Sequence, residues 1–438
     1  MPDILFLTQR IPYPPIKGEK IRPLQILRHV GKRYAVHLGT LIDDPSDWQH
    51  VDTVRRLCAD AYFAPLDRRI GKIACLRGLL TGAPLSFAFF RDRGLFRWVR
   101  RVLDGVRPEV IFVCSTNMAQ YVLDHPYRPP RLIVDYADVD SAKWADYATQ
   151  ARGPRRFVFA REARLVRAAE QRIAQVADAC TFVSEPEAEL FRRIAPAHAA
   201  KIAAIGSGVD AKYFAPDPGF APPYDPAHAT FVFTGTMDYW PNVDAVTWFA
   251  KEILPAIRRA HPLARFFIVG SAPAPAVQRL RDQPGVQVTG RVPDVRPYLE
   301  HAVAAVAPMR VARGIQNKVL EAMAMAKPVI VTTAALTGID VDPDREILLA
   351  DTVGGLATAC CRLIDEPATG ARVGAAARRR ILAEFTWPAR LAGFDPILHA
   401  PHQTPTDATA PGVSVELQRQ SRARGEPSER PGSGHPDP

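Results

Sequence analysis

Residues 308–331 read PMRVARGIQNKVLEAMAMAKPVIV, and this stretch decides the fold class. A short apolar run at 304–307 predicts a strand that leads into a loop containing Gly314. Asn317 is a good N-cap residue, so we expect a helix to begin there. Pro328 ends that helix before a second apolar run. This order of strand, glycine-containing loop, helix and strand predicts a βαβ unit of a parallel sheet.

The loop and the start of this helix have the chemistry of an anion site. In such a unit, free backbone N–H groups and a helix N-terminus face the carboxyl edge of the sheet. Arg310, Arg313 and Lys318 add positive charge nearby. The combination suits a diphosphate. Glu321, one turn into the helix, is placed to accept hydrogen bonds from sugar hydroxyls.

Apolar runs and helical segments alternate on both sides of this stretch. The runs are continuous, which suits strands buried on both faces of a parallel sheet. Between them lie amphipathic helices, such as those at 155–176 and 242–258. The pattern therefore predicts an α/β protein with two doubly wound, Rossmann-like domains. The expected strands are 4–7, 35–41, 110–114, 132–135, 180–184, 202–205, 231–234, 266–269, 286–289, 304–307, 329–332 and 347–350.

A proline-rich stretch separates the two expected domains. We assign 1–211 to an N-terminal Rossmann-like domain and 212–228 to a linker. A C-terminal Rossmann-like domain is expected at 229–399, with its last helix packing back on the first domain. The composition of 400–438 offers too little apolar surface to offset the ordering entropy, so we expect a disordered tail.

Composition restricts the function classes. The formal net charge of +10 favours anionic partners, but basic residues are dispersed and no nucleic-acid motif occurs, so nucleic acid is not expected. The six cysteines form no CxxC pair, and neither HExxH nor a His/Cys ligand cluster is present, so no metal site is predicted. The usual phosphate-loop and dinucleotide motifs are missing as well. Without a signal peptide or a long apolar segment, we expect a cytoplasmic protein.

The quoted stretch resembles the nucleotide-sugar site of family 4 retaining glycosyltransferases of GT-B fold, whose signature is a Glu-x7-Glu pair followed by EAMA-x-G/K-PV. Other motifs of that family recur here in the same order. A bacterial sugar-transferase subgroup linked to exopolysaccharide and exosortase (PEP-CTERM) gene clusters resembles the chain most, over roughly residues 3–395. The motifs are PYPP at 12–15 with KGEKIR at 17–22, VDYADVDSAKW at 134–144, GSGVD at 206–210, GTM at 235–237, VTGRV at 288–292 and ARGIQNKVLEAMAM at 312–325.

The resemblance implies a metal-independent enzyme that moves a sugar from a nucleoside diphosphate donor to an acceptor with retention of configuration. It also implies that the domain at 1–211 binds the acceptor and that the domain at 229–399 binds the nucleotide sugar. No cofactor is expected. The expected partners are a nucleotide sugar and a glycan or lipid-linked acceptor. Asp138, Lys318 and Arg313 are the catalytic candidates that it suggests. The donor-binding candidates are Gly18, Gly235, Thr236, Gly290, Arg291, Val292, Gly314, Ile315, Gln316, Asn317, Lys318 and Glu321.

Two departures from the family pattern bear on the donor. Arg313 occupies the position of the first Glu of the Glu-x7-Glu pair, which in the family contacts the donor sugar. The Arg and Lys that commonly follow the first glycine of the second domain are missing after Gly235. We expect Lys318 to neutralise the diphosphate instead. Asp138 follows a strand where many family members carry a His, so Asp138 or Asp140 is expected to bind a sugar hydroxyl.

Simpler readings remain for each of these residues. Lys318 and Glu321 also fit solvated helix positions, and Gly18 fits an ordinary turn. Asp138 fits a capping residue, and Arg313 fits a salt bridge to a neighbouring carboxylate. Two other functions also remain open: a catalytically degenerate GT-B protein that binds nucleotide sugar, and a sugar-nucleotide epimerase of the same fold.

Residues 68–101 mix arginines with leucine, phenylalanine and tryptophan. Such a mixture suits the anionic inner face of a membrane and a lipid-linked acceptor. Amphipathic helices with basic outer faces are the alternative.

Overall fold

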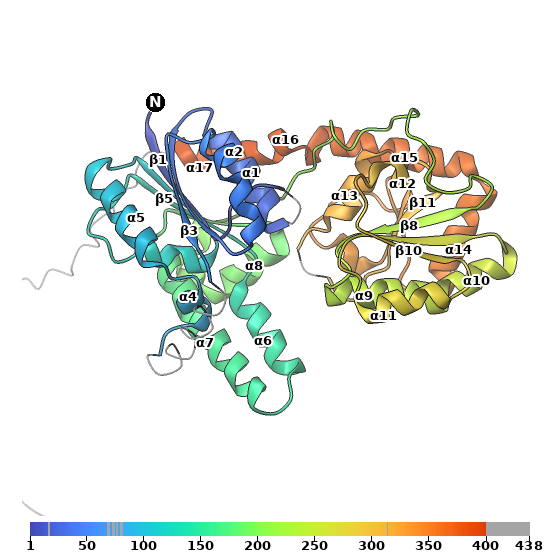
Figure 1. Cartoon of the computed structure of the whole chain (residues 1–438), viewed down its shortest axis with the longest axis horizontal. Helices are drawn as coiled ribbons and strands as arrows, with labels where there is room; N and C mark the ends of the chain where they lie inside the picture. The colour runs from blue at the N-terminus through green and yellow to red at the C-terminus, as the bar shows by residue number, and fades with distance from the viewer. Residues whose placement is uncertain are drawn as a thin grey trace, which may run out of the picture. The chain divides into compact units, whose positions relative to one another are not determined.

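The computed structural model describes residues 1–15, 18–67, 71, 75, 78, 82–312 and 314–399 (Figure 1). The described residues form two parallel sheets, one of seven strands and one of six, each flanked by helices. The prediction of two doubly wound α/β domains is confirmed. The expected tail, 400–438, and most of 68–81 lie outside the described residues.

The N-terminal sheet has the strand order β3-β2-β1-β4-β5-β6-β7, and all its neighbouring strands are parallel. The order reverses between β1 and β4, the kind of switch point beside which α/β sheets bind ligands. Its strands are β1 (Asp3–Thr8), β2 (Ala35–Ile42), β3 (Asp60–Pro65), β4 (Val110–Cys114), β5 (Arg131–Ala137), β6 (Ala179–Phe182) and β7 (Ile202–Ala204). Its helices are α1 (Gly18–Val30), α2 (Val51–Arg55), α4 (Leu85–Phe89), α5 (Arg93–Gly105), α6 (Asp140–Gln150), α7 (Pro154–Val176) and α8 (Glu185–Ile194), with 3-10 turns η1 (Pro45–His50), η2 (Thr116–Tyr121) and η3 (Pro196–Lys201).

The C-terminal sheet has the order β10-β9-β8-β11-β12-β13, again parallel throughout. Its strands are β8 (Thr230–Thr234), β9 (Arg265–Val269), β10 (Val286–Gly290), β11 (Ala304–Ala307), β12 (Val329–Val331) and β13 (Leu348–Leu349). Its helices are α9 (Trp240–Trp248), α10 (Leu254–Ala260), α11 (Pro275–Gln278), α12 (Arg296–Glu300), α13 (Asn317–Ala324), α14 (Val353–Asp365) and α15 (Pro367–Arg380), with 3-10 turns η5 (Arg279–Asp282) and η6 (Thr333–Leu336). The segments η4 (Phe249–Ile253) and η7 (Ile381–Phe385) are π-helical.

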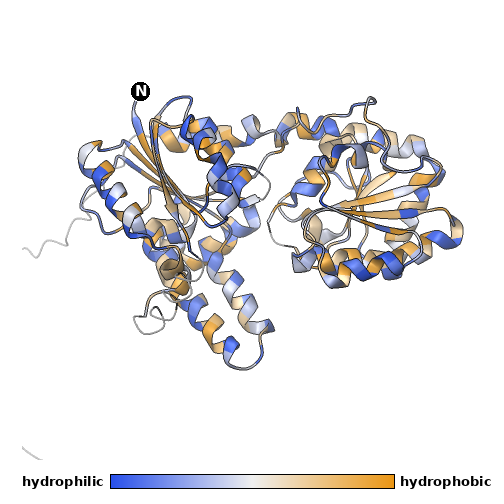
Figure 2. Cartoon of the chain, viewed as in Figure 1, coloured by the Kyte–Doolittle hydropathy of each residue, from blue (hydrophilic) through white to orange (hydrophobic). Residues whose placement is uncertain are grey.

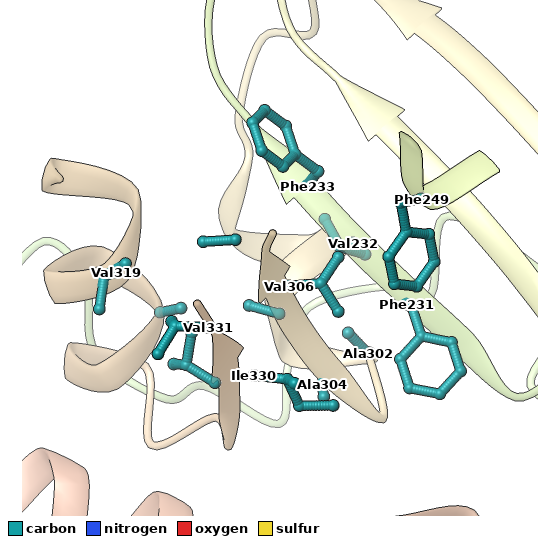
Figure 3. Close-up of a cluster of buried hydrophobic side chains, with 14 of the residues drawn as sticks. Phe231, Val232, Phe233, Phe249, Ala302, Ala304, Val306, Val319, Ile330 and Val331 are labelled. Carbon is teal, nitrogen blue, oxygen red and sulfur yellow. The ribbon is translucent and has the colours of Figure 1, made fainter. Parts of the chain in front are cut away.

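The cores explain why these runs form central strands. Figure 2 shows the strands of both sheets as mostly hydrophobic. In the C-terminal domain, Phe231, Val232 and Phe233 alternate across β8 and are fully buried (Figure 3). Val319 of α13 belongs to the same buried cluster as Val331 of β12. Burial of such a side chain contributes about 1.5–3 kcal/mol, so this packing fixes α13 against the sheet.

The segment after α15 joins the core of the N-terminal sheet. It continues into α16 (Trp387–Leu391), the 3-10 turn η8 (Ala392–Phe394) and α17 (Asp395–His399). Phe394 is fully buried, and its ring lies 5.4 Å from that of Phe112 on β4. The C-terminal end of the described chain therefore stabilises the first sheet.

Three local features differ from the sequence-based expectations. The edge strand β3 was not predicted, because its residues alternate in burial and read as a loop rather than as a continuous apolar run. The helix expected at 242–258 contains the π segment η4. Pro255, in the first turn of α10, has no N–H to donate to the preceding turn, which accounts for the irregularity. Asn317 is wrong as the N-cap of α13: Gln316 occupies that position, and Asn317 is the first helical residue.

Candidate functional site

A cavity of about 310 Å³ lies within the compact unit Met1–Ala400. Residues at the carboxyl ends of β4 and β5, the start of α1 and the loop before α13 line it. Five predicted site residues meet there: Gly18, Asp138, Gly314, Ile315 and Asn317. Arg313 lies outside the described residues. The other predicted residues do not line this cavity: Gly235, Thr236, Gly290, Arg291, Val292, Gln316, Lys318 and Glu321.

Two residues at the cavity edge have a strained backbone. Ser115, directly after β4, has φ 83°, and Ala137, at the end of β5, has φ 66°. The register between β5 and β6 also shifts between Asp135 and Ala137. Non-glycine residues adopt this left-handed conformation at a cost of about 1–3 kcal/mol, and such strain concentrates at functional sites. Here the bend at Ala137 places Asp138 in the cavity wall.

Asp138 and Asp140 share one lysine. Lys143 Nζ lies 2.8 Å from Asp138 Oδ2 and 3.5 Å from Asp140 Oδ1. Burial opposes the charge of Lys143, but Asp138 and then Asp140 raise its pKa above the ordinary value. Asp138 Oδ1 is buried and has no hydrogen-bond partner among the described residues. The cavity thus offers one carboxylate oxygen ready to accept a hydrogen bond from a ligand.

Gly314 faces that oxygen. Its φ is +62°, and a Cβ added there would stand 3.1 Å from Asp138 Oδ1. Glycine is required for both reasons: it tolerates the left-handed backbone, and it leaves room for the carboxylate.

A second ion pair lies deeper in the same wall. Arg22 of α1 donates two hydrogen bonds of 2.8 Å to the carboxylate of Asp135 on β5. Thr181 Oγ1 donates a third to Asp135 Oδ1 at 2.8 Å. Arg22 and Asp135 are 4 % and 2 % exposed, so the pair is almost fully desolvated. It ties the helix after the PYPP motif to the middle of the sheet.

Two buried glutamates accept hydrogen bonds from the backbone around Asp138. Neither was predicted from the sequence as a site residue. Glu187 of α8 accepts a 2.7 Å hydrogen bond from the N–H of Val139. Glu170 of α7 accepts one of 3.0 Å from the N–H of Ser141. Burial raises the pKa of Glu170 to about 7, against hydrogen bonds from Ser141 that lower it. Carboxylates at a helix N-terminus are stabilising, so these two fix the start of α6 and with it Asp138.

Lys318 occupies the carboxyl edge of the other sheet. Its Nζ lies 3.1 Å from Asn242 Oδ1 and 3.3 Å from Gln316 Oε1, and 5.0 Å from the centre of the Phe233 ring. Asn242 also donates to the carbonyl oxygen of Thr236 at 2.8 Å, which ties the β8–α9 loop to α13. No carboxylate of a described residue pairs with this ammonium group.

Glu321 lies three residues further along α13 and is half-buried. Burial raises its pKa to about 7, while Lys318 pulls in the opposite direction. Burial likewise lowers the pKa of Lys318 to about 8, against the effect of Glu321. Both side chains therefore change charge near neutral pH, as groups at binding sites often do.

Glycines bring the loops of this domain close together. A Cβ on Gly235 would lie 2.9 Å from Asn242 Nδ2 and 3.5 Å from Lys318 Cε. Gly290, at the end of β10, has φ +76°. The exposed Arg291 and the half-buried Val292 follow it. The absence of a side chain at Gly235 keeps open backbone next to the lysine.

The comparisons with known proteins agree with this geometry. Residues 228–366, which include α13 and the loop before it, match the family model described as glycosyl transferases group 1. The second domain therefore resembles that family, and the chain has the GT-B fold. No curated protein sequence matches it.

Solved structures show the same fold over nearly the whole enzyme. Sucrose-phosphate synthase from Thermosynechococcus elongatus is 18% identical, with a TM-score of 0.65 over 90% of this chain and 97% of its own. Anabaena Alr3699/HepE in complex with UDP-glucose is 15% identical, with a TM-score of 0.63 over 90% and 98%. WaaG, a glycosyltransferase involved in lipopolysaccharide biosynthesis, is 14% identical, with a TM-score of 0.62 over 90% and 99%. At these identities the likeness concerns the fold.

Arg310 is engaged away from Lys318. Its Nε donates to Asp244 Oδ2 at 3.0 Å, and its guanidinium lies 5.4 Å from the centre of the Trp248 ring. Both partners belong to α9, so the charge of Arg310 is already paired there. Of the two described cations of this stretch, Arg310 is paired with a carboxylate, whereas Lys318 lies on neutral oxygens.

Neither a metal cluster nor a membrane span is found in the described part of the chain. No three His, Cys, Asp or Glu side chains gather there in a way that would hold a metal ion. No helix of the described residues is long and apolar enough to cross a bilayer.

Proposed function

We propose that the enzyme transfers a sugar from a nucleoside diphosphate donor to a glycan or lipid-linked acceptor, with retention of configuration, in cell-surface polysaccharide assembly. One observation carries the proposal. Lys318 holds a desolvated ammonium at the start of α13, on amide oxygens and without a carboxylate among the described residues. A diphosphate supplies the negative charge that this position lacks.

The mechanism follows from where the charge develops. As the glycosidic bond to the diphosphate breaks, negative charge grows on the leaving oxygen. Lys318 and the free N–H groups at the start of α13 stabilise that charge. Because they are already in place and largely shielded from water, little reorganisation is needed during the reaction. Because the charge is stabilised in this way, no general acid is required to protonate the leaving oxygen.

The opposite side of the site suits hydroxyl groups. Asp138 offers one unpaired carboxylate oxygen beside Gly314 and Ile315. We assign it to a hydroxyl of the transferred sugar or of the acceptor, with Asp140 as its neighbour through Lys143. Glu321 contacts the donor sugar from α13.

UDP is the first candidate for the donor nucleotide, because Anabaena Alr3699/HepE, which has the same fold, is described in complexes with UDP and with UDP-glucose. Metal-independent transfer and a role in exopolysaccharide assembly rest on the resemblance of 312–325 and 134–144 to the exosortase-linked subgroup.

Thermal unfolding with nucleotides tests the donor site. Wild-type protein is compared across UDP, GDP, ADP, dTDP and their sugars. Ligand at about 100 times its dissociation constant adds roughly 2.7 kcal/mol to the free energy of unfolding. We expect this gain with one base, its loss in Lys318→Ala and Glu321→Ala, and its retention in Lys251→Ala, which alters an exposed lysine of the same domain.

Turnover then separates the possible functions. Release of the nucleoside diphosphate that depends on an acceptor supports transfer. Binding without release identifies a catalytically degenerate protein, and conversion of the donor sugar without an acceptor identifies an epimerase. Absence of stabilisation by every nucleotide contradicts the proposed site.

A further inference from the structure

The α6–α7 hairpin is the feature of the first domain that the proposed function leaves unused. Figure 1 shows α6 and α7 side by side, running away from the N-terminal sheet and joined by a short turn. The hairpin begins at Asp140, in the cavity wall, so its base belongs to the site. Eleven residues of α6 at 1.5 Å each put the turn about 16 Å from the cavity.

The turn carries unpaired positive charge and an exposed ring. We define the hairpin tip as residues 150–157, QARGPRRF. Arg152, Arg155 and Arg156 are exposed, and none forms an ion pair with a described residue. Phe157 is 76% exposed. No acidic residue occurs between 149 and 161, so the tip has a net charge of +3 from its three arginines.

The carboxylates of α7 do not offset this charge at the surface. Glu162 is fully buried and accepts hydrogen bonds from the N–H groups of Leu85 and Ser86 at 2.7 and 2.8 Å. Glu170 is buried at the base of the hairpin, against Ser141. The exposed surface of α7 therefore keeps only basic charge, which continues from the tip along Arg164, Arg167 and Arg172.

The hairpin is stiffened from within, without help from Phe157. Trp144 and Tyr147 of α6 pack with Phe159 of α7, with ring centres 5.5 to 6.1 Å apart. Phe157 points away from that cluster, as its exposure shows. Burying its ring on a partner would contribute about 1.5–3 kcal/mol, comparable with a core phenylalanine.

We propose that the hairpin tip docks on the surface of an anionic lipid bilayer. Arginines beside an exposed aromatic ring are the combination that binds the interface of acidic membranes: the guanidinium groups meet lipid phosphates, and the ring enters the acyl boundary. Single-stranded nucleic acid is bound along a basic groove with several stacking rings. Here a single ring lies at the end of a helical hairpin. This arrangement favours a bilayer surface over single-stranded nucleic acid as the partner.

Docking of the tip would set the distance between the cavity and the bilayer. This role of the hairpin rests on the proposed function. The cavity with Asp138 would stand about 16 Å above the headgroups, the length of α6. A lipid-linked acceptor, anchored by its tail, then reaches the site with a glycan that extends about that far from the headgroups. The hairpin also contacts the stretch 68–101, for which the sequence suggested membrane contact. Arg161 of α7 donates a hydrogen bond of 2.9 Å to the carbonyl oxygen of Gly78.

Vesicle flotation with the full chain tests this proposal. The wild type is mixed with vesicles of 70% phosphatidylcholine and 30% phosphatidylglycerol, and with pure phosphatidylcholine. We expect binding to the first that weakens with salt and little binding to the second. Arg155→Glu with Arg156→Glu lowers the partition coefficient at least about tenfold, and Phe157→Ser about fivefold.

Matched variants separate this site from general charge and from folding. Arg372→Glu with Arg379→Glu reverses two exposed charges on α15 and keeps wild-type binding, as does Leu263→Ser at a 57% exposed leucine. We expect all variants to keep the wild-type melting temperature and the stabilisation by nucleotide. Loss of vesicle binding can then be distinguished from misfolding and from failure of the proposed donor site. Equal binding by the hairpin variants and the wild type overturns the proposal. So does retention on a polyanion without vesicle binding.

Discussion

The carboxyl edges of the two sheets differ in whether their cationic side chains are paired with carboxylates. At the N-terminal edge, Arg22 is paired with Asp135 and Lys143 with Asp138. At the C-terminal edge, Lys318 meets only the side-chain oxygens of Asn242 and Gln316 among the described residues. The cations of the first edge therefore have carboxylate partners, whereas the lysine of the second edge has none among the described residues.

This difference suits the two edges to two kinds of ligand. An edge whose cations are already paired and that has a spare carboxylate oxygen is suited to hydroxyl groups rather than to a phosphate. An unneutralised lysine beside a helix N-terminus attracts a phosphate and stabilises charge on it. The parallel sheet supplies the same loop geometry to both, and the side chains decide which ligand each edge takes.

The buried Arg22–Asp135 pair gives the largest expected effect. Arg22→Ala leaves the carboxylate of Asp135 desolvated with Thr181 as its remaining side-chain donor, and we expect a loss of about 3–5 kcal/mol in the free energy of unfolding. Urea denaturation measures it. Arg28→Ala, at an exposed position of α1, should change stability by less than about 0.5 kcal/mol. A loss below about 1 kcal/mol for Arg22→Ala would show that the N-terminal edge does not depend on this pair.

Asp138→Asn tests whether the two edges act on different parts of the donor and acceptor. The amide accepts hydrogen bonds more weakly than the carboxylate, a difference of about 1.5–3 kcal/mol. Sugar transfer should therefore fall roughly 10- to 100-fold, while stabilisation by the nucleoside diphosphate stays unchanged. Asp282→Asn, at an exposed position of the other domain, serves as the control. A parallel loss of nucleotide binding would place Asp138 on the diphosphate instead.

Gly314→Ala tests the contact between the edges. The added Cβ would occupy a left-handed backbone position 3.1 Å from Asp138 Oδ1, so we expect a destabilisation of about 1 kcal/mol or more by thermal unfolding. Gly354, in the first turn of α14, has no atom within 4 Å of an added Cβ. Gly354→Ala should be neutral or stabilising by up to about 1 kcal/mol. Equal effects at both glycines would argue against a tight approach at Gly314.

The smallest expected effect is a pH dependence from Glu321. Because its pKa is about 7 in the folded protein against an ordinary 4.5, the folded state retains a proton that the unfolded state has lost between these values. Stability contributed by this group is present below pH 4.5 and is lost as the pH rises to about 7. Glu321→Gln should remove this decline, whereas Glu252→Gln, at an exposed position, should keep it. Identical pH profiles of the wild type and Glu321→Gln would show that Glu321 is not shielded from water.

Much of the fold was predictable from local pattern. Short continuous apolar runs predicted buried strands such as β1, β8 and β11, because strands covered on both faces admit few polar residues. The edge strand β3 was missed, since its Asp60 and Pro65 are exposed and interrupt the pattern. The start of α13 was misplaced by one residue, which propensity alone does not resolve.

The site was predictable only in part. The sequence indicated Lys318 and Asp138, because a cation at a helix start and a carboxylate after a strand are local features. It gave no indication of Glu170 and Glu187, whose carboxylates lie inside amphipathic helices and meet the Asp138 loop only after folding. Nothing local in the sequence indicated Asn242 as the partner of Lys318.

The sequence by itself determined the α/β class, the succession of strands and helices, and the chemistry of the loop before α13, since each depends on residues near one another in the chain. The tertiary structure alone decided which charges are neutralised. Arg22 and Asp135 are 113 residues apart, and Lys318 and Asn242 are 76 apart. Strand order brings such residues together. Burial then raises the cost of leaving a charge unpaired, because an ion removed from water must find its partner within the protein.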